Sequence, residues 1–293
     1  IMRTRKVTIF IRLEYAFILL LLIYPLTAFA DTSENESFHF EDYHQVLKQH
    51  RKTDGFVAYE ALKDTSDGLL HFLARVENLS KQEYARFSKN DKIAFWINVY
   101  NACMLKLVTD LYPLSRQNYK YIIYPRLSVK QVPGIFKQPT IPILGKHMSL
   151  DDIEHKVLRK QFREPRIHMA LVCAARGCPP LRQEPYHGET LNKQLDDQVR
   201  AFLDNDSRFQ LNMSTNTILL SPIFKWFAED FVNNENDFPL RHSYPSKHRA
   251  AIRFIAQYLN SAQQRFIQET KLEVEYLRYD WTLNDITLLP KSS

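Results

Sequence analysis

Apolar residues recur at helical spacing through much of the chain, most clearly between Asn90 and Leu111. Asn90 or Asp91 can cap the first turn of this segment, and Pro113 marks its end. Its apolar positions, which together cover a broad face, are Ile93, Phe95, Trp96, Val99, Cys103, Leu105, Leu107 and Val108. The pattern therefore predicts a long helix with one face in the core.

Shorter helices are predicted on both sides of this long one. Amphipathic spacing or a capping residue indicates them at residues 56–62, 69–79, 149–158, 190–203, 223–231 and 248–259. Between the long helix and the one that Ser149 caps, residues 112–148 contain five prolines. We expect a long loop with short strand pieces there, and loops of that length are usually functional or act as packed covers.

Strand patterns are fewer and do not alternate regularly with the helices. Arg166–Ala174 is the clearest buried strand, and it leads into a sharp turn at Arg176–Pro180. Residues 209–211 and 217–220 predict a hairpin, and residues 272–279 a last strand. This order favours an α+β fold, a predominantly helical single domain around a small mixed or antiparallel sheet, over a doubly wound sheet.

The first thirty residues have the pattern of an export signal. A basic start is followed by the apolar run Tyr15–Leu26 and by Ala28-Phe29-Ala30, a small-x-small cleavage site. The alternative is an uncleaved anchor, which needs roughly 20 apolar residues, and this run is shorter and ends near Pro25. We expect cleavage after Ala30 and a periplasmic or secreted protein, with no stable transmembrane span after cleavage.

The remaining boundaries and the charge follow from that cleavage. We expect a lead-in with a helix at 31–54, a globular domain at 55–285 and a flexible tail at 286–293. Removing residues 1–30 takes away four basic residues and one acid, so the formal charge falls from +6 to about +3. No concentrated basic stripe remains, and we therefore expect no nucleic-acid partner. The partner would be a small molecule or an envelope protein.

The three cysteines differ in their surroundings. Cys103 lies on the apolar face of the long helix and is interpreted as a core thiol. Cys173 and Cys178 flank the turn after the buried strand, and a disulfide between them is the simplest structural expectation in an oxidising compartment. The functional alternative is that Cys178 is a free thiolate nucleophile, with His168 or His155 as its base.

The helix after Ser149 carries Asp151-Asp-Ile-Glu-His155, in which Asp151 and His155 are one turn apart and can pair, while Glu154 points elsewhere. In a strand, His168 shares a face with Ala170 and Val172 and not with Cys173. A metal held by His155, Glu154 and His168 is an alternative, but the stronger His-Glu-x-x-His signature is absent, so we assign no metal ligands. No phosphate loop or dinucleotide fingerprint indicates a cofactor either.

Six ordered blocks resemble the domain-of-unknown-function 547 family, and they span about residues 55–285. They begin at Phe95 (FWINVYNA), Ser149 (SLDDIEH), Arg166 (RIHMALVCA), Gly177 (GCPPL), Leu220 (LSPIFKWFAEDF) and Tyr279 (YDWTLN). The resemblance implies no settled activity, although bacterial members of the family are often exported. It marks polar residues whose burial would cost free energy as candidates for functional roles. They are Asn98, Asn101, Glu154, His155, Arg166, His168, Cys178 and Asp280.

These residues give three hypotheses of different kinds. The first is a polar pocket of hydrolase or acyl-transfer type, in which Cys178 attacks, His168 or His155 is the base and Asn101 orients the base. Binding roles then fall to Asn98, Glu154, Arg166 and Asp280. The second is a non-catalytic domain of the cell envelope that binds a ligand or a protein. The third is a metal-binding domain.

Overall fold

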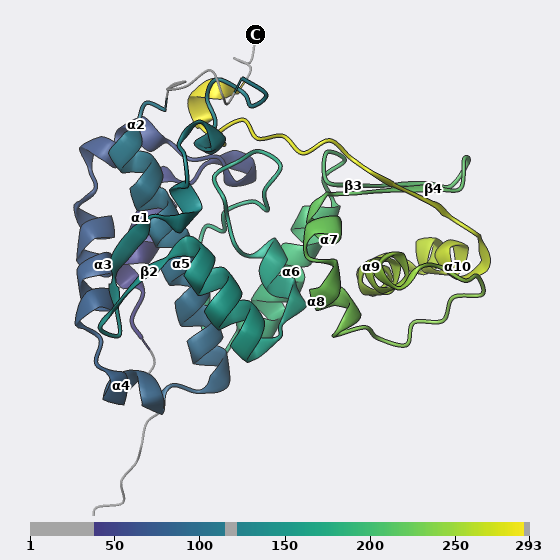
Figure 1. Cartoon of the computed structure of the whole chain (residues 1–293), viewed down its shortest axis with the longest axis horizontal. Helices are drawn as coiled ribbons and strands as arrows, with labels where there is room; N and C mark the ends of the chain where they lie inside the picture. The colour runs from purple at the N-terminus through teal and green to yellow at the C-terminus, as the bar shows by residue number, and fades with distance from the viewer. Residues whose placement is uncertain (1–37, 115–121, 290–293) are drawn as a thin grey trace, which may run out of the picture. The chain divides into compact units, whose positions relative to one another are not determined.

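The computed structural model describes residues 38–114 and 122–289, all of which belong to one compact unit (Figure 1). The predicted export signal lies outside the described residues. So do residues 31–37 of the predicted lead-in, residues 115–121 of the predicted long loop and residues 290–293 of the predicted tail. No helix in the described ranges has both the length and the apolar character that crossing a bilayer requires.

Helices dominate the described chain. The α-helices are α1 Glu41–His50, α2 Tyr59–Asp64, α3 Asp67–Asn78, α4 Lys81–Arg86, α5 Lys89–Leu111, α6 Leu191–Leu203, α7 Ile223–Trp226, α8 Ala228–Val232, α9 Ser246–Ala256 and α10 Ser261–Glu269. The strands are β1 Pro139–Ile143, β2 Lys146–Ser149, β3 Phe209–Asn212, β4 Thr217–Leu220 and β5 Glu273–Tyr276. β1 and β2 form an antiparallel pair, whereas the three-stranded sheet β3-β4-β5 is antiparallel at β3/β4 and parallel at β4/β5. The predicted α+β class with a small mixed sheet is confirmed.

The long helix α5 organises the first of two hydrophobic clusters. Its central part, residues 93–105, is buried on every side, and the helix packs against α2, α3 and β1. Its cap is Ser88, two to three residues before the predicted position, because Ser88 and Asp91 form a reciprocal capping box. Helix formation here therefore combines a strong start signal with burial of an extensive apolar surface.

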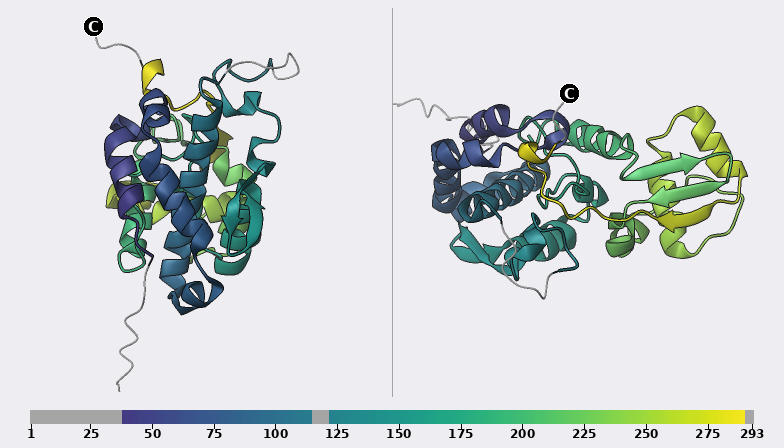
Figure 2. Two further views of the ribbon diagram at one scale, coloured as in Figure 1. Left: turned by 90° about the vertical axis from the view of Figure 1, so that its left-hand side faces the viewer. Right: turned by 90° about the horizontal axis from the view of Figure 1, so that it is seen from above.

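The second hydrophobic cluster surrounds the three-stranded sheet. The core faces of α6, α8 and α9 contribute Phe202, Phe231 and Ile255 to it, and Ile218 comes from β4. Strands and helices of this part lie next to each other at the green and yellow end of the colour scale (Figure 2). The predicted hairpin is confirmed, with Phe209 opposite Leu220, and the predicted last strand is shortened to β5.

The prediction of a strand at Arg166–Ala174 is wrong. Pro165–Met169 form a turn of 3₁₀-helix, and the chain then continues irregularly to Ala175. The residues are buried as the apolar run suggested, but the side chain of Asn101 bonds the main chain at Ala170 and Val172 in place of a neighbouring strand. A continuous apolar run reports burial, and it cannot by itself distinguish a strand from another buried conformation.

The helix predicted after Ser149 is present and has an unexpected geometry. It is a π-helix over Asp152–Phe162, longer than the predicted 149–158, and it ends at Arg163 with a φ of 53°. Ser149 and Asp152 exchange hydrogen bonds at its start, as the capping prediction requires. The i→i+5 hydrogen bonding of a π-helix makes each turn wider than an α-turn, and such turns are frequent at functional sites.

Candidate functional site

A cavity of about 190 Å³ lies where the π-helix, the Cys173–Cys178 turn, α7 and the chain after β5 meet. Its walls are largely aromatic: Tyr100, Phe136, Trp226, Phe227, Tyr279 and Trp281. Its polar lining is formed by Lys130, Asp151, Glu154, His155, His168 and the two sulfur-bearing residues Cys173 and Cys178. Four of the eight polar candidates, Cys178, His168, His155 and Glu154, therefore lie in one pocket.

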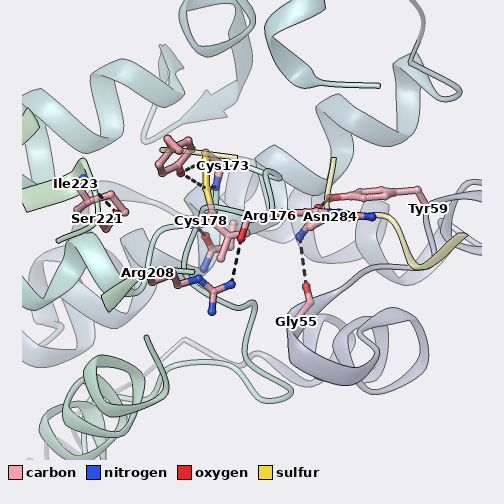
Figure 3. The surroundings of a disulfide bond; sticks show 12 residues. Gly55, Tyr59, Cys173, Arg176, Cys178, Arg208, Ser221, Ile223 and Asn284 are labelled. Atoms are coloured by element: carbon pink, nitrogen blue, oxygen red, sulfur yellow. Dashed lines mark hydrogen bonds between the residues drawn. A yellow bond between two sulfur atoms is a disulfide. The ribbon is translucent and has the colours of Figure 1, made fainter. Parts of the chain in front are cut away.

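Cys173 and Cys178 are joined in a disulfide (Figure 3). Cys178 is only 3% exposed, whereas Cys173 is partly exposed. The Tyr279 hydroxyl lies 3.2 Å from the Sγ atom of each cysteine, and the main-chain N–H of Cys173 donates to Cys178 Sγ at 3.0 Å. The disulfide prediction is confirmed, and in this state Cys178 is not a free thiolate.

His168 is almost completely buried and is held by a carboxylate. Its Nε2 lies 2.7 Å from Asp230 Oδ2, and its ring stacks on Phe227 with 4.0 Å between centroids. Burial lowers the pKa of His168 even though Asp230 acts to raise it. At neutral pH the imidazole is therefore neutral, and Nε2–H donates to Asp230.

Asp230 is the centre of a small charged network. Its carboxylate accepts from Arg159 Nε at 2.5 Å and from Arg159 Nη2 at 3.1 Å, in addition to His168. Burial acts to raise the pKa of Asp230, but the hydrogen bonds from His168 and Arg159 outweigh it and hold the pKa well below its usual range. The carboxylate is thus ionised, and it fixes the orientation of both partners.

His155 is exposed at the edge of the pocket and pairs with a different residue from the predicted one. Arg159 Nη1 lies 2.9 Å from His155 Nδ1, so Arg159, and not Asp151, is its hydrogen-bonding partner. Because Arg159 can only donate, Nδ1 is the acceptor and the proton of the neutral ring sits on Nε2. Burial and then the charge of Arg159 lower the pKa of His155.

Glu154 lies in the pocket, and the prediction that it points elsewhere is wrong. The prediction assumed α-helical turns, whereas the wider π-helix places Asp151, Glu154 and His155 along the same cavity. Burial raises the pKa of Glu154 to about 7; Arg159 opposes this, and Asp151 and Asp230 add to it. Nothing in residues 38–114 or 122–289 hydrogen-bonds this carboxyl, which is therefore available to a ligand.

Asn98 and Asn101 are buried but do not line the pocket, which is a correction to the predicted binding and orienting roles. Asn101 donates to Ala170 O at 3.0 Å and accepts from Val172 N at 2.9 Å. Asn98 does the same for Tyr186 O and N, at 2.8 and 2.9 Å. Each amide replaces a missing backbone partner, and Asn101 thereby positions the segment that leads to Cys173.

Arg166 and Asp280 also lie outside the pocket lining. Arg166 forms a two-pronged ion pair with Glu164 at 2.8 and 2.7 Å and a further one with Asp196 at 2.9 Å. The Asp280 side chain accepts from Thr282 N at 2.8 Å and so shapes the turn after Tyr279. Both residues are satisfied by structural partners, and neither is a ligand-binding group of this cavity.

Metal binding receives no support from the geometry. Within the described ranges, no group of three or more His, Cys, Asp or Glu side chains could hold a metal ion. His155, Glu154 and His168 line one cavity, but His155 and His168 are committed to Arg159 and Asp230. The pocket therefore offers a carboxyl, a disulfide and aromatic surfaces to a ligand.

Comparison with known proteins identifies part of the chain. Residues 84–203 match the family described as "Protein of unknown function, DUF547". The chain contains a DUF547 domain. No curated protein and no solved structure matches it. The DUF547 match runs from α4 to the end of α6, so it includes Glu154, His155, His168 and both pocket cysteines.

A third of the pocket lining comes from beyond the DUF547 match, and sequence reasoning missed most of it. The lining residues Trp226, Phe227, Tyr279 and Trp281 follow residue 203, and so does Asp230, which holds His168 from outside the lining. They stand in the two later blocks of the resemblance, where Asp230 is an acid between two phenylalanines in a short helix. That acid was a usable signal, whereas the aromatic residues could not be distinguished from ordinary core residues.

We expect the Asn101→Ala variant to lose about 1–3 kcal/mol of stability, because it leaves the Ala170 carbonyl and the Val172 N–H buried without their partner. Urea denaturation measures the loss. Asn78→Ala is the control, since Asn78 also donates to a main-chain carbonyl but at an exposed position. Equal losses for the two variants would contradict the positioning role of Asn101.

Proposed function

We propose that this DUF547 protein is exported and that the pocket is the active site of a thiol-dependent hydrolase or acyl transferase. The single observation that carries the proposal is the convergence of Cys178, His168, His155 and Glu154 on one cavity. Such clustering of a nucleophile with titratable groups in a concave, largely aromatic site is the usual arrangement of an enzyme active site. The proposed nucleophile is Cys178 in the reduced form of the protein.

Glu154 is the best candidate for proton transfer in this reaction. Its pKa of about 7 lets it both give and take a proton near neutral pH, and its carboxyl is open to the pocket. In the proposed sequence the Cys178 thiolate attacks an acyl carbonyl and forms a thioester, and the leaving group takes a proton from Glu154. Water or another acceptor, deprotonated by Glu154, then attacks the thioester and regenerates the thiolate.

The remaining pocket residues suit orientation more than proton transfer. His168 is fixed by Asp230 and Phe227, and it forms a rigid polar wall. Lys130 lies with its Nζ atom 4.3 Å from the centre of the Trp281 ring, so the pocket combines a cation with aromatic faces. These features favour a small substrate that has a planar or apolar part and a negatively charged group.

The experiment is an acylation assay on protein reduced under native conditions. We expect reduced protein to form a mass-detectable thioester on Cys178 with an activated acyl ester, and oxidised protein to form none. Cys103→Ala is the matched control, because Cys103 is a buried thiol outside the pocket and its loss should leave acylation intact. Absence of a Cys178 adduct on fully reduced, folded protein would overturn the enzyme proposal.

Export has its own test. We expect protein recovered from the producing cell to begin at Asp31 and to lie outside the cytoplasm. Sequencing of its N-terminus after cell fractionation measures both. A cytoplasmic protein that retains residues 1–30 would contradict the proposal.

The second candidate function is a ligand-binding domain without catalysis. One observation favours it: Trp226 is 47% exposed at the pocket and packs beside Trp281 at 5.8 Å, which makes an aromatic platform for a ligand. In that case Cys178→Ala would change stability alone, and Trp226→Ala would weaken ligand binding.

A further inference from the structure

The Cys173–Cys178 disulfide joins two sulfur atoms in unequal surroundings. Both line the cavity, but Cys173 is partly exposed and Cys178 is buried. A disulfide in the wall of a cavity is reachable by a ligand, whereas one that only braces a fold needs no such access. The position of this bond therefore calls for an account beyond stability.

The turn between the two cysteines is already held by main-chain hydrogen bonds. Arg176 N donates to Thr282 O at 2.8 Å, Gly177 N to Asp280 O at 2.9 Å and Cys178 N to Ala175 O at 3.0 Å. Two of these bonds tie the turn to the chain after β5, far away in sequence. Because the disulfide closes a loop with a separation of only five residues, it removes little chain entropy as well. The disulfide therefore contributes little to the stability of the fold.

We propose that Cys173–Cys178 is a redox-active disulfide that exchanges with a dithiol entering the pocket. Cys173 is the sulfur attacked, because it is the more exposed one. Cys178 is the leaving sulfur, because its Sγ accepts a hydrogen bond from Cys173 N–H at 3.0 Å. The Tyr279 hydroxyl lies 3.2 Å from both sulfur atoms and is placed to donate to the Cys178 thiolate once the S–S bond breaks. Hydrogen bonds of this kind stabilise a thiolate, and a better leaving thiolate speeds exchange.

The exchange balances in two steps. A substrate thiolate bonds to Cys173 Sγ, the S–S bond breaks, and its electron pair goes to Cys178 Sγ as a thiolate. The second thiolate of the substrate then attacks the substrate sulfur of this mixed disulfide and releases Cys173 as a thiolate. Two electrons and two protons pass from the dithiol to the protein, and the substrate leaves as a disulfide.

The carboxyl of Glu154 is placed to handle one of these protons. It faces the same cavity, where the charged and titratable neighbours are Asp151, His155, His168 and Lys130, with Arg159 and Asp230 next to them and Tyr100 and Tyr279 in the wall. The incoming thiol gives its proton to Glu154, and the Cys178 thiolate recovers it. Exchange does not depend on acyl chemistry and would occur in a protein that hydrolyses nothing.

The experiment uses the oxidised mature protein and dithiothreitol as the dithiol probe, without denaturant. Alkylation with iodoacetamide and peptide mapping then report each cysteine. We expect Cys173 and Cys178, which line the cavity, to become labelled, while Cys103, which is buried outside it, stays unlabelled. A monothiol such as 2-mercaptoethanol should stop at a mixed disulfide on Cys173. Reduction that requires denaturant, or a mixed disulfide on Cys178, overturns the proposal.

Tyr279→Phe tests the leaving-thiolate assignment. Removing a hydrogen bond to a thiolate should slow native reduction about tenfold at pH 7 and move the alkylation midpoint of Cys178 up by about one pH unit. Tyr43→Phe is the matched control, since its hydroxyl is also buried but lies outside the pocket and bonds neither sulfur. Equal behaviour of the two variants overturns the role of Tyr279. If Tyr279→Phe does not fold, the alkylation midpoints of the two cysteines in the wild-type protein are compared instead. The proposal requires a lower midpoint pH for Cys178 than for Cys173.

The acyl-transfer proposal and the exchange proposal can fail separately. If the protein exchanges with dithiothreitol but forms no thioester, the exchange proposal stands and the acyl-transfer proposal fails. If the disulfide resists the dithiol, and Cys178 is acylated only after reduction in denaturant and refolding, the acyl-transfer proposal stands and the exchange proposal fails.

Discussion

Glu154→Gln is expected to stabilise the protein at pH 8 by about 3 kcal/mol and to leave its stability at pH 4 nearly unchanged. The pKa of Glu154 is raised from 4.5 to about 7 in the folded protein. The folded state therefore keeps a proton that the unfolded chain releases, and stability is lost as the pH rises from about 4.5 to 7. The neutral amide of Gln avoids this loss, since each pH unit corresponds to about 1.4 kcal/mol.

Urea denaturation of both oxidised proteins at pH 4 and pH 8 measures this effect. Glu83→Gln is the matched control, because hydrogen bonds from Ser80 lower the pKa of Glu83 and its replacement should bring no gain at pH 8. A Glu154→Gln difference that is the same at both pH values would mean that the carboxyl is not desolvated. The same variant should also slow the reactions proposed for the pocket, since Gln cannot transfer a proton.

Gly55→Ala is expected to destabilise the protein by about 3 kcal/mol or more. Gly55 has a φ of +78°, and an added Cβ would lie 2.5 Å from Leu181 N and 2.6 Å from Pro180 Cα. Both are main-chain atoms, so no side chain can rotate away and the backbone itself must move. Because Pro180 and Leu181 lie only two and three residues after Cys178, we expect faster reduction of the disulfide as well.

Gly134→Ala separates the steric cost from the conformational one. Gly134 has a φ of +65°, but its added Cβ would meet no described atom within 4 Å. It should therefore cost only about 1 kcal/mol, the usual penalty for a left-handed residue other than Gly. Thermal unfolding of the two variants gives the comparison, and similar losses would show that contact with Pro180 and Leu181 is unimportant.

The fold was predictable in segments whose apolar residues face a hydrophobic core. α5 and α6 begin and end within about two residues of the predicted bounds, because apolar spacing and a capping residue or proline agree there. The segment Arg166–Ala174 was misinterpreted because it is apolar apart from Arg166 and His168, and a side chain far away in sequence, Asn101, satisfies its backbone. The π-helix was equally hidden, since no residue pattern at Asp152–Phe162 differs from that of an α-helix.

Half of the candidate site was predictable for a related reason. Polar residues within apolar segments stand out in a sequence. Their residue type does not say whether the side chain faces a cavity or hydrogen-bonds the main chain. Cys178 and Glu154 face the pocket, whereas the side chains of Asn98 and Asn101 hydrogen-bond main-chain groups. Tyr279 escaped prediction because its role depends on a hydroxyl that reaches two sulfur atoms about one hundred residues earlier.

Residues 273–289 join distant parts of the molecule. β5 completes the second cluster by pairing with β4, Thr282 and Asp280 hold the cysteine turn, and Asn284 bonds Gly55. During synthesis, neither the sheet nor this turn can be finished until that segment has left the ribosome. The chain should thus stay open to chaperones until late in translation, and a protein that folds so late is still able to pass through a secretion channel.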